Sequence, residues 1–317
     1  MLVRHAHEGG TVQLHGPVYL GNETRSQPKT PSTHGEGLSL SLPTHVLMAT
    51  GGAIRLRTDP ETLLNGYGCS HRPRPWAITF ASSTASSVSE RGYMAADAAR
   101  LRAQRIALAE QDERAAVKAC LGDVREKLAQ LLRLEVGTEI VLSASGTDAE
   151  LLALALAHIG GNEDAPICNI LIAPEETGRG VPLAARGLHF AVDTALGAKV
   201  EPGSLIGGFR PGTRLCTIAV RNGDAQLKPL EAIEADIRDA VQDAMERRER
   251  ALLHALDLSK TGILAPRPNL LGELRRTYGS KFDIVVDACQ TRMSPSSIGR
   301  YLAMDAMVLI TGSKFFT

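Results

Sequence analysis

The sequence predicts an α/β fold, a three-layer α/β/α arrangement in which helices cover both faces of a mostly parallel sheet. Apolar segments of strand length alternate with helical segments along the second half of the chain. Polar or small residues directly follow several of the apolar segments, as at the edge where parallel strands end. Size agrees with this prediction, because 317 residues with 44% hydrophobic content can bury a large core.

The expected elements can be placed in order along the chain. Residues 92–134 are Ala-rich with intermixed charges, which predicts one long helix or two successive helices. Helices are also expected at residues 151–157 and 229–248. Strands are expected at residues 140–142, 188–192, 214–220, 251–256 and 284–286, and once more just before Lys314. This alternation implies parallel strands joined by helical crossovers.

Composition divides the chain into three segments. Residues 1–45 are rich in Gly, Ser, Thr, Pro and His, and we expect an irregular N-terminal arm. Residues 46–135 are expected to form a loop and helical segment that borders the functional site. Residues 136–317 are expected to form the large ligand-binding domain.

Charge and cysteine content exclude several classes of function. The chain has 35 basic and 35 acidic residues, so its zero net charge gives no reason to expect nucleic acid or an anionic membrane as a partner. No apolar stretch has the length of a signal peptide core or a membrane span. The five cysteines lack a Cys-x-x-Cys spacing, which indicates neither disulfides nor zinc and favours a cytoplasmic protein. The histidines match no metal-ligand spacing, so no metal is expected.

Lys314 is the most informative residue for function. An apolar strand delivers it into the small polar turn Thr311-Gly312-Ser313-Lys314. An amine held among apolar residues loses its proton more easily, and a neutral amine can form a Schiff base with an aldehyde cofactor such as pyridoxal phosphate. The alternative for a lone Gly-Ser-Lys is a lysine on a solvated turn.

Asp287 ends another apolar strand, in the run Phe282-Asp283-Ile284-Val285-Val286-Asp287. A carboxylate at this edge of a parallel sheet can keep the pyridine nitrogen of such a cofactor protonated, so that the ring acts as an electron sink. Gln290, three residues later, can donate its amide to the phenolic oxygen of the cofactor. The alternative is that Asp287 caps the next helix and Gln290 is solvated.

A third motif lies at the predicted strand, turn and helix around Ser145-Gly146-Thr147. Free backbone N–H groups at the start of a helix, together with the Thr147 hydroxyl and the helix dipole, form a ready phosphate site. We therefore expect Gly146 and Thr147 to bind a phosphate. Plain helix capping by Ser145 or Thr147 is the alternative.

Three motifs together, in this order and spacing, resemble those of fold-type I pyridoxal phosphate enzymes: Ser145-Gly146-Thr147, Asp287-Ala288-Cys289-Gln290 and Thr311-Gly312-Ser313-Lys314. The most similar branch is the class V aminotransferase and cysteine desulfurase group. The resemblance extends approximately from residue 130 to Thr317. It implies pyridoxal 5'-phosphate as cofactor, an internal aldimine at Lys314, an amino acid or amine as small-molecule substrate, and a homodimer.

The resemblance also implies roles for two hydroxyl residues. Ser259, in the polar turn after residues 251–256, matches the residue that contacts the phenolic oxygen of the cofactor, although a simple β-turn closed by Gly262 is the alternative. Ser313 matches a residue that contacts the phosphate. The implied cofactor-binding set is Gly146, Thr147, Ser259, Asp287, Gln290, Ser313 and Lys314, with Lys314 as the catalytic residue.

The chain departs from the family pattern in two respects. Related enzymes place a ring-stacking histidine or aromatic residue where this chain has residues 173–181, and that stretch has no ring; Glu176 and Thr177 are the positional matches. The family also continues beyond the lysine strand into a small C-terminal domain, which this sequence does not include. We therefore expect an aminotransferase of class V type. The alternatives are a lyase or desulfurase that cleaves C–S or C–N bonds, and a noncatalytic truncated remnant that serves as a binding or dimerisation module.

Overall fold

The computed structural model describes residues 2–5, 39–50, 56–78, 85–160, 165–194, 197–312 and 314. The chain divides into two compact units, each of which is described here by itself. The larger unit holds the first strand and the described residues from Ala129 onward, and the smaller unit holds the described residues from 39 to Leu128. Ser313 and most of the expected N-terminal arm, residues 6–38, lie outside the described residues.

A mostly parallel sheet forms the centre of the larger unit. Among the described residues it has seven strands in the order β2-β1-β7-β6-β5-β3-β4. The strands are β1 (Leu2–His5), β2 (Thr138–Val141), β3 (Ile167–Ile172), β4 (Arg214–Ile218), β5 (Arg250–Leu256), β6 (Phe282–Asp287) and β7 (Met307–Leu309). Strands β3 to β7 pair in parallel, whereas β1 pairs antiparallel with both β2 and β7. The predicted mostly parallel sheet is confirmed.

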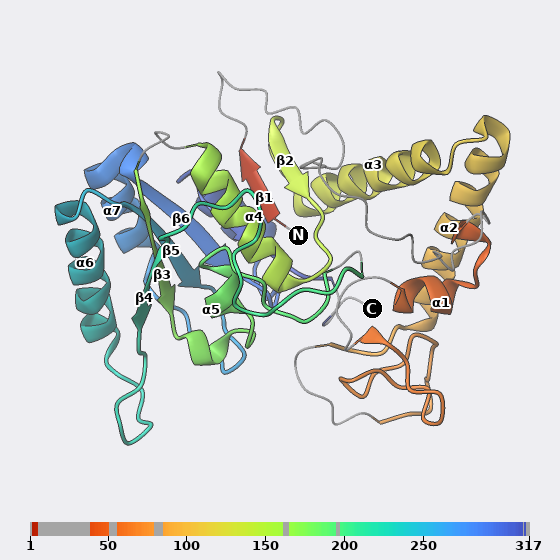
Figure 1. The fold of residues 1–317 in the computed structure, drawn as a ribbon, viewed down its shortest axis with the longest axis horizontal. Helices are drawn as coiled ribbons and strands as arrows, with labels where there is room; N and C mark the ends of the chain where they lie inside the picture. Colours follow the sequence, from red (N-terminus) through yellow and green to blue (C-terminus); the bar gives the residue numbers. More distant parts are fainter. Residues whose placement is uncertain are drawn as a thin grey trace, which may run out of the picture. The chain divides into compact units, whose positions relative to one another are not determined.

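Helices cover both faces of this sheet (Figure 1). α4 (Gly146–Ile159) and α5 (Val181–Ala184) lie on one face, and α6 (Leu230–Glu246) and α7 (Pro268–Tyr278) lie on the other. α8 (Pro295–Leu302) packs on β7 and β1. Ala153 and Leu154 of α4 pack with Leu252 and Val285 from neighbouring strands. The predicted α/β/α arrangement is therefore confirmed.

The central strands are buried along their whole length. Every residue of β3, β5 and β6 is buried, which explains why these segments read as apolar runs rather than as alternating patterns. The short 3₁₀ turns Pro174–Glu176 and Gly279–Lys281 lie after β3 and before β6. Helix α6 buries Ile233, Ile237 and Val241, which recur at the four-residue spacing of one helix face.

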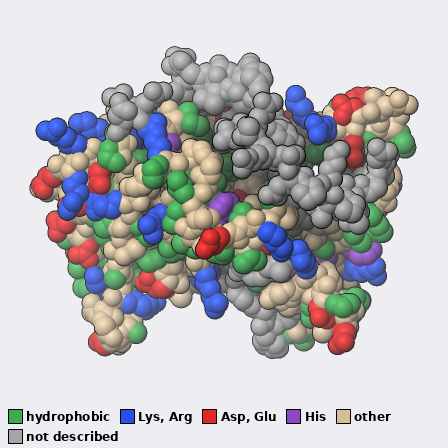
Figure 2. All heavy atoms as spheres, in the orientation of Figure 1, with side chains coloured by type: hydrophobic (Ala, Val, Ile, Leu, Met, Phe, Trp, Pro, Cys, Tyr) green, Lys and Arg blue, Asp and Glu red, His purple; other side chains and the backbone are tan. Residues whose placement is uncertain are grey.

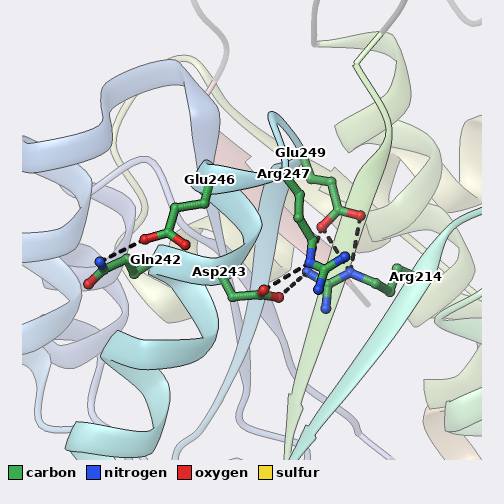
Figure 3. Close-up of polar contacts among 6 residues, drawn as sticks. All are labelled: Arg214, Gln242, Asp243, Glu246, Arg247 and Glu249. Carbon is green, nitrogen blue, oxygen red and sulfur yellow. Dashed lines mark hydrogen bonds and ion pairs between the residues drawn. The ribbon is translucent and has the colours of Figure 1, made fainter.

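An ion-pair cluster fixes the edge strand β4 to the end of α6 (Figure 3). The Arg214 guanidinium donates from Nε to both carboxylate oxygens of Glu249, at 3.0 and 2.9 Å, and lies 2.9 Å from the carboxylate of Asp243. Arg247 Nε donates to Asp243 at 2.8 Å. These contacts raise the pKa of Arg214, chiefly through its hydrogen bonds to Glu249. The charges of the cluster therefore compensate one another, as expected for a chain with balanced charge.

The smaller unit contains helices α1 (Thr44–Ala49), α2 (Glu90–Glu110) and α3 (Glu113–Leu132), preceded by a 3₁₀ turn at Ser39–Ser41. Gln111 takes a left-handed conformation with φ of 52° and ends α2. Asp112 then accepts hydrogen bonds from two backbone N–H groups of α3 at 2.8 and 3.0 Å. Of the two forms expected for residues 92–134, one long helix or two successive helices, the structure has the second, and turn chemistry at two residues explains the break.

Two expectations about strands were wrong. Residues 188–192 form no strand; Leu188 makes an isolated antiparallel bridge with Leu205, in a segment rich in glycine. Among the described residues, the apolar residues of this segment have no neighbouring strand with which to form a ladder. Conversely, residues 2–5 of the expected irregular arm form β1, whose backbone is bonded on both sides by β2 and β7. This pairing helps to stabilise so short a strand, and its partners come from distant parts of the chain.

No helix among the described residues is long and apolar enough to cross a membrane. Nor do the described residues contain three or more histidine, cysteine or acidic side chains grouped as ligands for a metal ion. Basic and acidic side chains lie interspersed on the face shown in Figure 2.

Candidate functional site

The carboxyl ends of β5, β6 and β7 lie side by side. Leu256, Asp287 and Leu309 are the last residues of these strands and occupy one row of the sheet, since Asp287 pairs with Leu256 on one side and with Leu309 on the other. A polar segment follows each strand. The topology thus brings the turns after β5, β6 and β7 to one edge, where parallel α/β sheets place their ligand sites.

Asp287 is buried at this edge, with 8% of its surface exposed. Its Oδ1 accepts a hydrogen bond of 3.0 Å from the backbone N–H of Cys289. By the alternation of side chains along β6, it shares a face with Val285, which packs against α4. The carboxylate therefore projects on the side of the sheet where α4 begins.

The Cys289 thiol links Asp287 to Lys314. Burial raises the pKa of this thiol to about 12; the negative charge of Asp287 adds to the rise, and the positive charge of Lys314 opposes it. Both groups therefore lie close enough to the thiol to act on its pKa. The structure thus brings the expected carboxylate and the expected amine to the same thiol. With so high a pKa the thiol stays protonated near neutral pH, so it is not an activated nucleophile.

Gln290 carries a fully buried amide. It has 0% exposure, and neither its Oε1 nor its Nε2 has a hydrogen-bonding partner among the described residues. The turn that carries it is fixed, because Thr291 Oγ1 donates to the Thr311 carbonyl at 2.8 Å and Ala288 N–H donates to the Leu309 carbonyl at 2.9 Å. A buried amide of this kind is a candidate contact for a polar ligand.

The start of α4 has the form expected of a phosphate site. Ser145 is the N-cap: its Oγ accepts from the Asp148 N–H at 3.1 Å and donates to the Asp148 carboxylate at 2.6 Å. Gly146 is exposed, and a Cβ added to it would meet no atom within 4 Å. Capping of α4, the alternative interpretation of this motif, is therefore performed by Ser145 and not by Thr147. The space beside Gly146 is open.

The loop after β3 packs closely on the half-buried Thr147. A Cβ on Gly180 would lie 3.2 Å from Thr147 Cγ2 and 3.1 Å from Phe190, and a Cβ on Gly178 would lie 3.7 Å from Thr147 Oγ1. Glycine at position 180 therefore allows the loop to approach the first turn of α4.

Ser259 is buried in the turn after β5, and its hydroxyl is already engaged. It donates to Glu176 Oε2 at 3.1 Å and accepts from the Ile263 N–H at 3.1 Å. Thr261 donates to the same Glu176 oxygen from Oγ1 at 2.8 Å. Glu176, a positional match for the ring-stacking residue, instead holds this turn. Ser259 can address a cofactor only by its remaining lone pair or by giving up its bond to Glu176.

A buried polar pair below this edge was missed by sequence reasoning. His254 Nδ1 of β5 lies 2.7 Å from Glu150 Oε2 of α4, and both side chains are 4% exposed. His254 pairs with Val285, one alternate position below Asp287 on the same face. The one available signal was a histidine inside the apolar run Leu252-Leu253-His254-Ala255-Leu256. The pair connects the first turns of α4 to the strand that carries the Ser259 turn.

Comparison with known proteins gives distant likenesses alone. No family model and no curated protein matches the chain. Among solved structures, mouse CSAD is similar at 15% identity and a TM-score of 0.38, over 61% of this chain and 37% of that one. The glutamate decarboxylase domain of a diaminobutyrate-pyruvate transaminase and L-2,4-diaminobutyrate decarboxylase from Vibrio parahaemolyticus is similar at 11% identity and a TM-score of 0.39, over 61% and 40%.

A putative histidinol-phosphate aminotransferase from Erwinia carotovora atroseptica is similar at 15% identity and a TM-score of 0.36, over 67% of this chain and 52% of that one. The chain thus spans between 37% and 52% of the length of these three structures. Likenesses this distant do not establish an activity.

Proposed function

We propose that this chain is the cofactor-binding part of a pyridoxal phosphate-dependent enzyme that acts on an amino acid or amine, with Lys314 as the lysine that holds the cofactor. The observation that carries the proposal is the convergence of Asp287 and Lys314 on the Cys289 thiol, beside the buried, unpartnered amide of Gln290. A carboxylate, an amine and a free amide at one sheet edge are the groups that this cofactor requires.

The chemistry of the residues present fits the cofactor. The amide of Gln290 can donate to the phenolic oxygen, which would satisfy a group that has no partner among the described residues. Asp287 can accept from the ring nitrogen, because the Cys289 N–H occupies only its Oδ1. The start of α4 offers backbone N–H groups to the phosphate beside the open space at Gly146. Ser313, expected to contact the phosphate, stays a prediction.

When bound, pyridoxal phosphate supplies an aldehyde for covalent attachment of amines and a ring that delocalises negative charge from the substrate α-carbon. Asp287 would hold the proton on the ring nitrogen, which makes the ring a better electron acceptor. Lys314, once displaced by the substrate amine, would take a proton from the α-carbon and return one as general base and acid. Gln290 would fix the orientation of the ring from within the buried turn.

Transamination is the reaction we favour within this class. It needs proton movements that one lysine can perform, and Lys314 acts on the same thiol as Asp287. Elimination with C–S or C–N cleavage is the alternative. The Cys289 thiol gives it no support, because its raised pKa keeps it protonated.

The experiment is a titration of the protein with pyridoxal phosphate followed by absorbance spectroscopy. We expect a new visible band that is lost in Lys314→Ala and retained in Lys281→Ala, since Lys281 is exposed and lies in the 3₁₀ turn before β6. Asp287→Asn is expected to keep the attachment but shift the band, because the ring nitrogen loses its anionic partner. A folded protein that gains no band would contradict the proposal.

A further inference from the structure

Lys260 is a half-buried lysine that lies where three segments meet. It belongs to the turn after β5, and its Nζ donates to the carbonyl of Thr177, in the loop after β3, at 3.1 Å. The same loop packs through Gly178 and Gly180 on Thr147 at the start of α4. The ammonium group of Lys260 is therefore held by the loop that lies against the proposed phosphate site.

The carboxylate of this cluster is committed to other groups. Glu176 Oε2 accepts from Ser259 at 3.1 Å and from the Thr261 hydroxyl at 2.8 Å, and Glu176 Oε1 lies 3.6 Å from the Arg221 guanidinium. Arg221 thus balances the charge of Glu176. No ion pair between Lys260 and a carboxylate occurs among the described residues, and a carbonyl oxygen does not neutralise an ammonium charge.

Two other lysines of the larger unit, Lys228 and Lys199, differ in this respect. Lys228, also half-buried, donates to Asp236 at 2.9 Å, and the exposed Lys199 donates to Asp193 at 2.6 Å. Lys281 is exposed to solvent. A half-buried ammonium group that forms no ion pair stays available to bind an anion that arrives beside it.

We propose that Lys260 binds an oxyanion at the rim of the site. The inference deepens the proposed function, on which it rests for the identity of the anion. Two oxyanions reach this rim in the proposed reaction, the carboxylate of an amino acid substrate and the phosphate of the cofactor. Binding of a substrate carboxylate would make amino acids the substrate class, in preference to simple amines.

The test measures oxyanion binding to the cofactor-free protein by isothermal titration calorimetry, with inorganic phosphate and with glutarate as probes. Lys260→Met removes the charge and keeps the length of the side chain, Lys260→Arg keeps the charge, and Lys281→Met is the matched control on an exposed lysine. We expect Lys260→Met to lower the affinity for one of the two probes about tenfold, as for the loss of one charge-assisted hydrogen bond. Lys260→Arg should recover most of the affinity, and Lys281→Met should match the unchanged protein.

The two probes distinguish the sources of the anion. Weaker phosphate binding, together with weaker binding of pyridoxal phosphate but not of pyridoxal, assigns Lys260 to the cofactor phosphate. Weaker glutarate binding with unchanged pyridoxal phosphate affinity assigns it to the substrate carboxylate. If neither anion binds the unchanged protein, or if Lys260→Met binds both equally well, the inference is overturned. Oxyanion binding that depends on Lys260 in a protein that takes up no pyridoxal phosphate would refute the proposed function alone.

Discussion

Gln290 shows at the scale of one residue how a ligand site can be recognised before any ligand is seen. The expected alternative, a solvated side chain, does not hold, because the residue has 0% exposure. An amide with no partner in such a place opposes folding. We propose that the amide of Gln290 is retained because it forms a hydrogen bond to a bound cofactor.

Replacing this amide should therefore separate stability from binding. We expect Gln290→Met, which has a similar shape, to raise the free energy of unfolding of the cofactor-free protein by about 1 kcal/mol, because it removes an unsatisfied polar group. The same variant should bind pyridoxal phosphate more weakly. Urea denaturation and a cofactor titration measure the two effects. A variant that loses stability and binds normally would show that Gln290 is a structural residue.

Residue-scale reasoning from the sequence succeeded where a motif was local and failed where partners were remote. Asp287 was identifiable because it ends an apolar run, and the structure places it at the carboxyl edge of the sheet. The hydroxyl of Ser259 was expected to face a cofactor, but its partner Glu176 lies 83 positions away in the sequence. No spacing rule connects two loops that only the parallel pairing of β3 and β5 brings together.

At the scale of elements, close packing at Gly180 positions the start of α4. The backbone φ of Gly180, −85°, suits any residue, so a substitution at this position tests packing alone. We expect Gly180→Ala to push Thr147 and Phe190 aside, to lower stability by about 1 to 3 kcal/mol, and to weaken pyridoxal phosphate binding. Gly207→Ala is the control, because a Cβ there meets no atom within 4 Å. Equal melting temperatures and equal cofactor affinities for the two variants would contradict this account.

The Glu150 and His254 pair connects α4 to β5, and a double-mutant cycle tests that connection. Both side chains are buried, so removing one partner leaves the other without compensation. We expect Glu150→Leu or His254→Phe alone to lower the free energy of unfolding by about 3 kcal/mol. The double variant should lose much less than the two single losses together. Additive losses, measured by denaturant unfolding, would show that the two groups do not interact.

Elements were predictable from the sequence where burial made them apolar throughout. The strands β5 and β6 and the helix α6 were expected close to their observed positions, because a continuous apolar run or a helical period identifies each of them. β1 was missed because it has four residues and depends on two neighbours for its hydrogen bonds. Residues 188–192 were misread because an apolar segment forms a strand only beside another strand.

At the scale of the whole molecule, surface carboxylates paired with arginine set the response to acid. The hydrogen bond from Arg267 lowers the pKa of Glu234, and that from Arg247 lowers the pKa of Asp243. A lowered folded-state pKa means that the ion pair stabilises the folded chain above the ordinary pKa. That stabilisation is lost as the pH falls through the lowered value.

Stability should therefore decline as the pH falls below 4.5 and then below 3.8, the ordinary values for Glu234 and Asp243. Asp283 opposes the trend, because burial raises its pKa and its protonated form is favoured in the folded state. We expect Glu234→Gln to show a shallower acid decline in melting temperature than the unchanged chain. Glu110→Gln, at the exposed end of α2, should show the full decline. Parallel curves for all three proteins, measured by scanning calorimetry, would refute this prediction.

The central claim, that Lys314 holds pyridoxal phosphate at the edge formed by β5, β6 and β7, is tested most directly by one measurement. The protein is incubated with pyridoxal phosphate, reduced with borohydride, digested and mapped by mass spectrometry. The account predicts that the reduced cofactor is fixed on the peptide that contains Lys314 and that Asp287→Ala lowers the yield. A folded protein with no fixed cofactor, or with the label on another lysine, would contradict it.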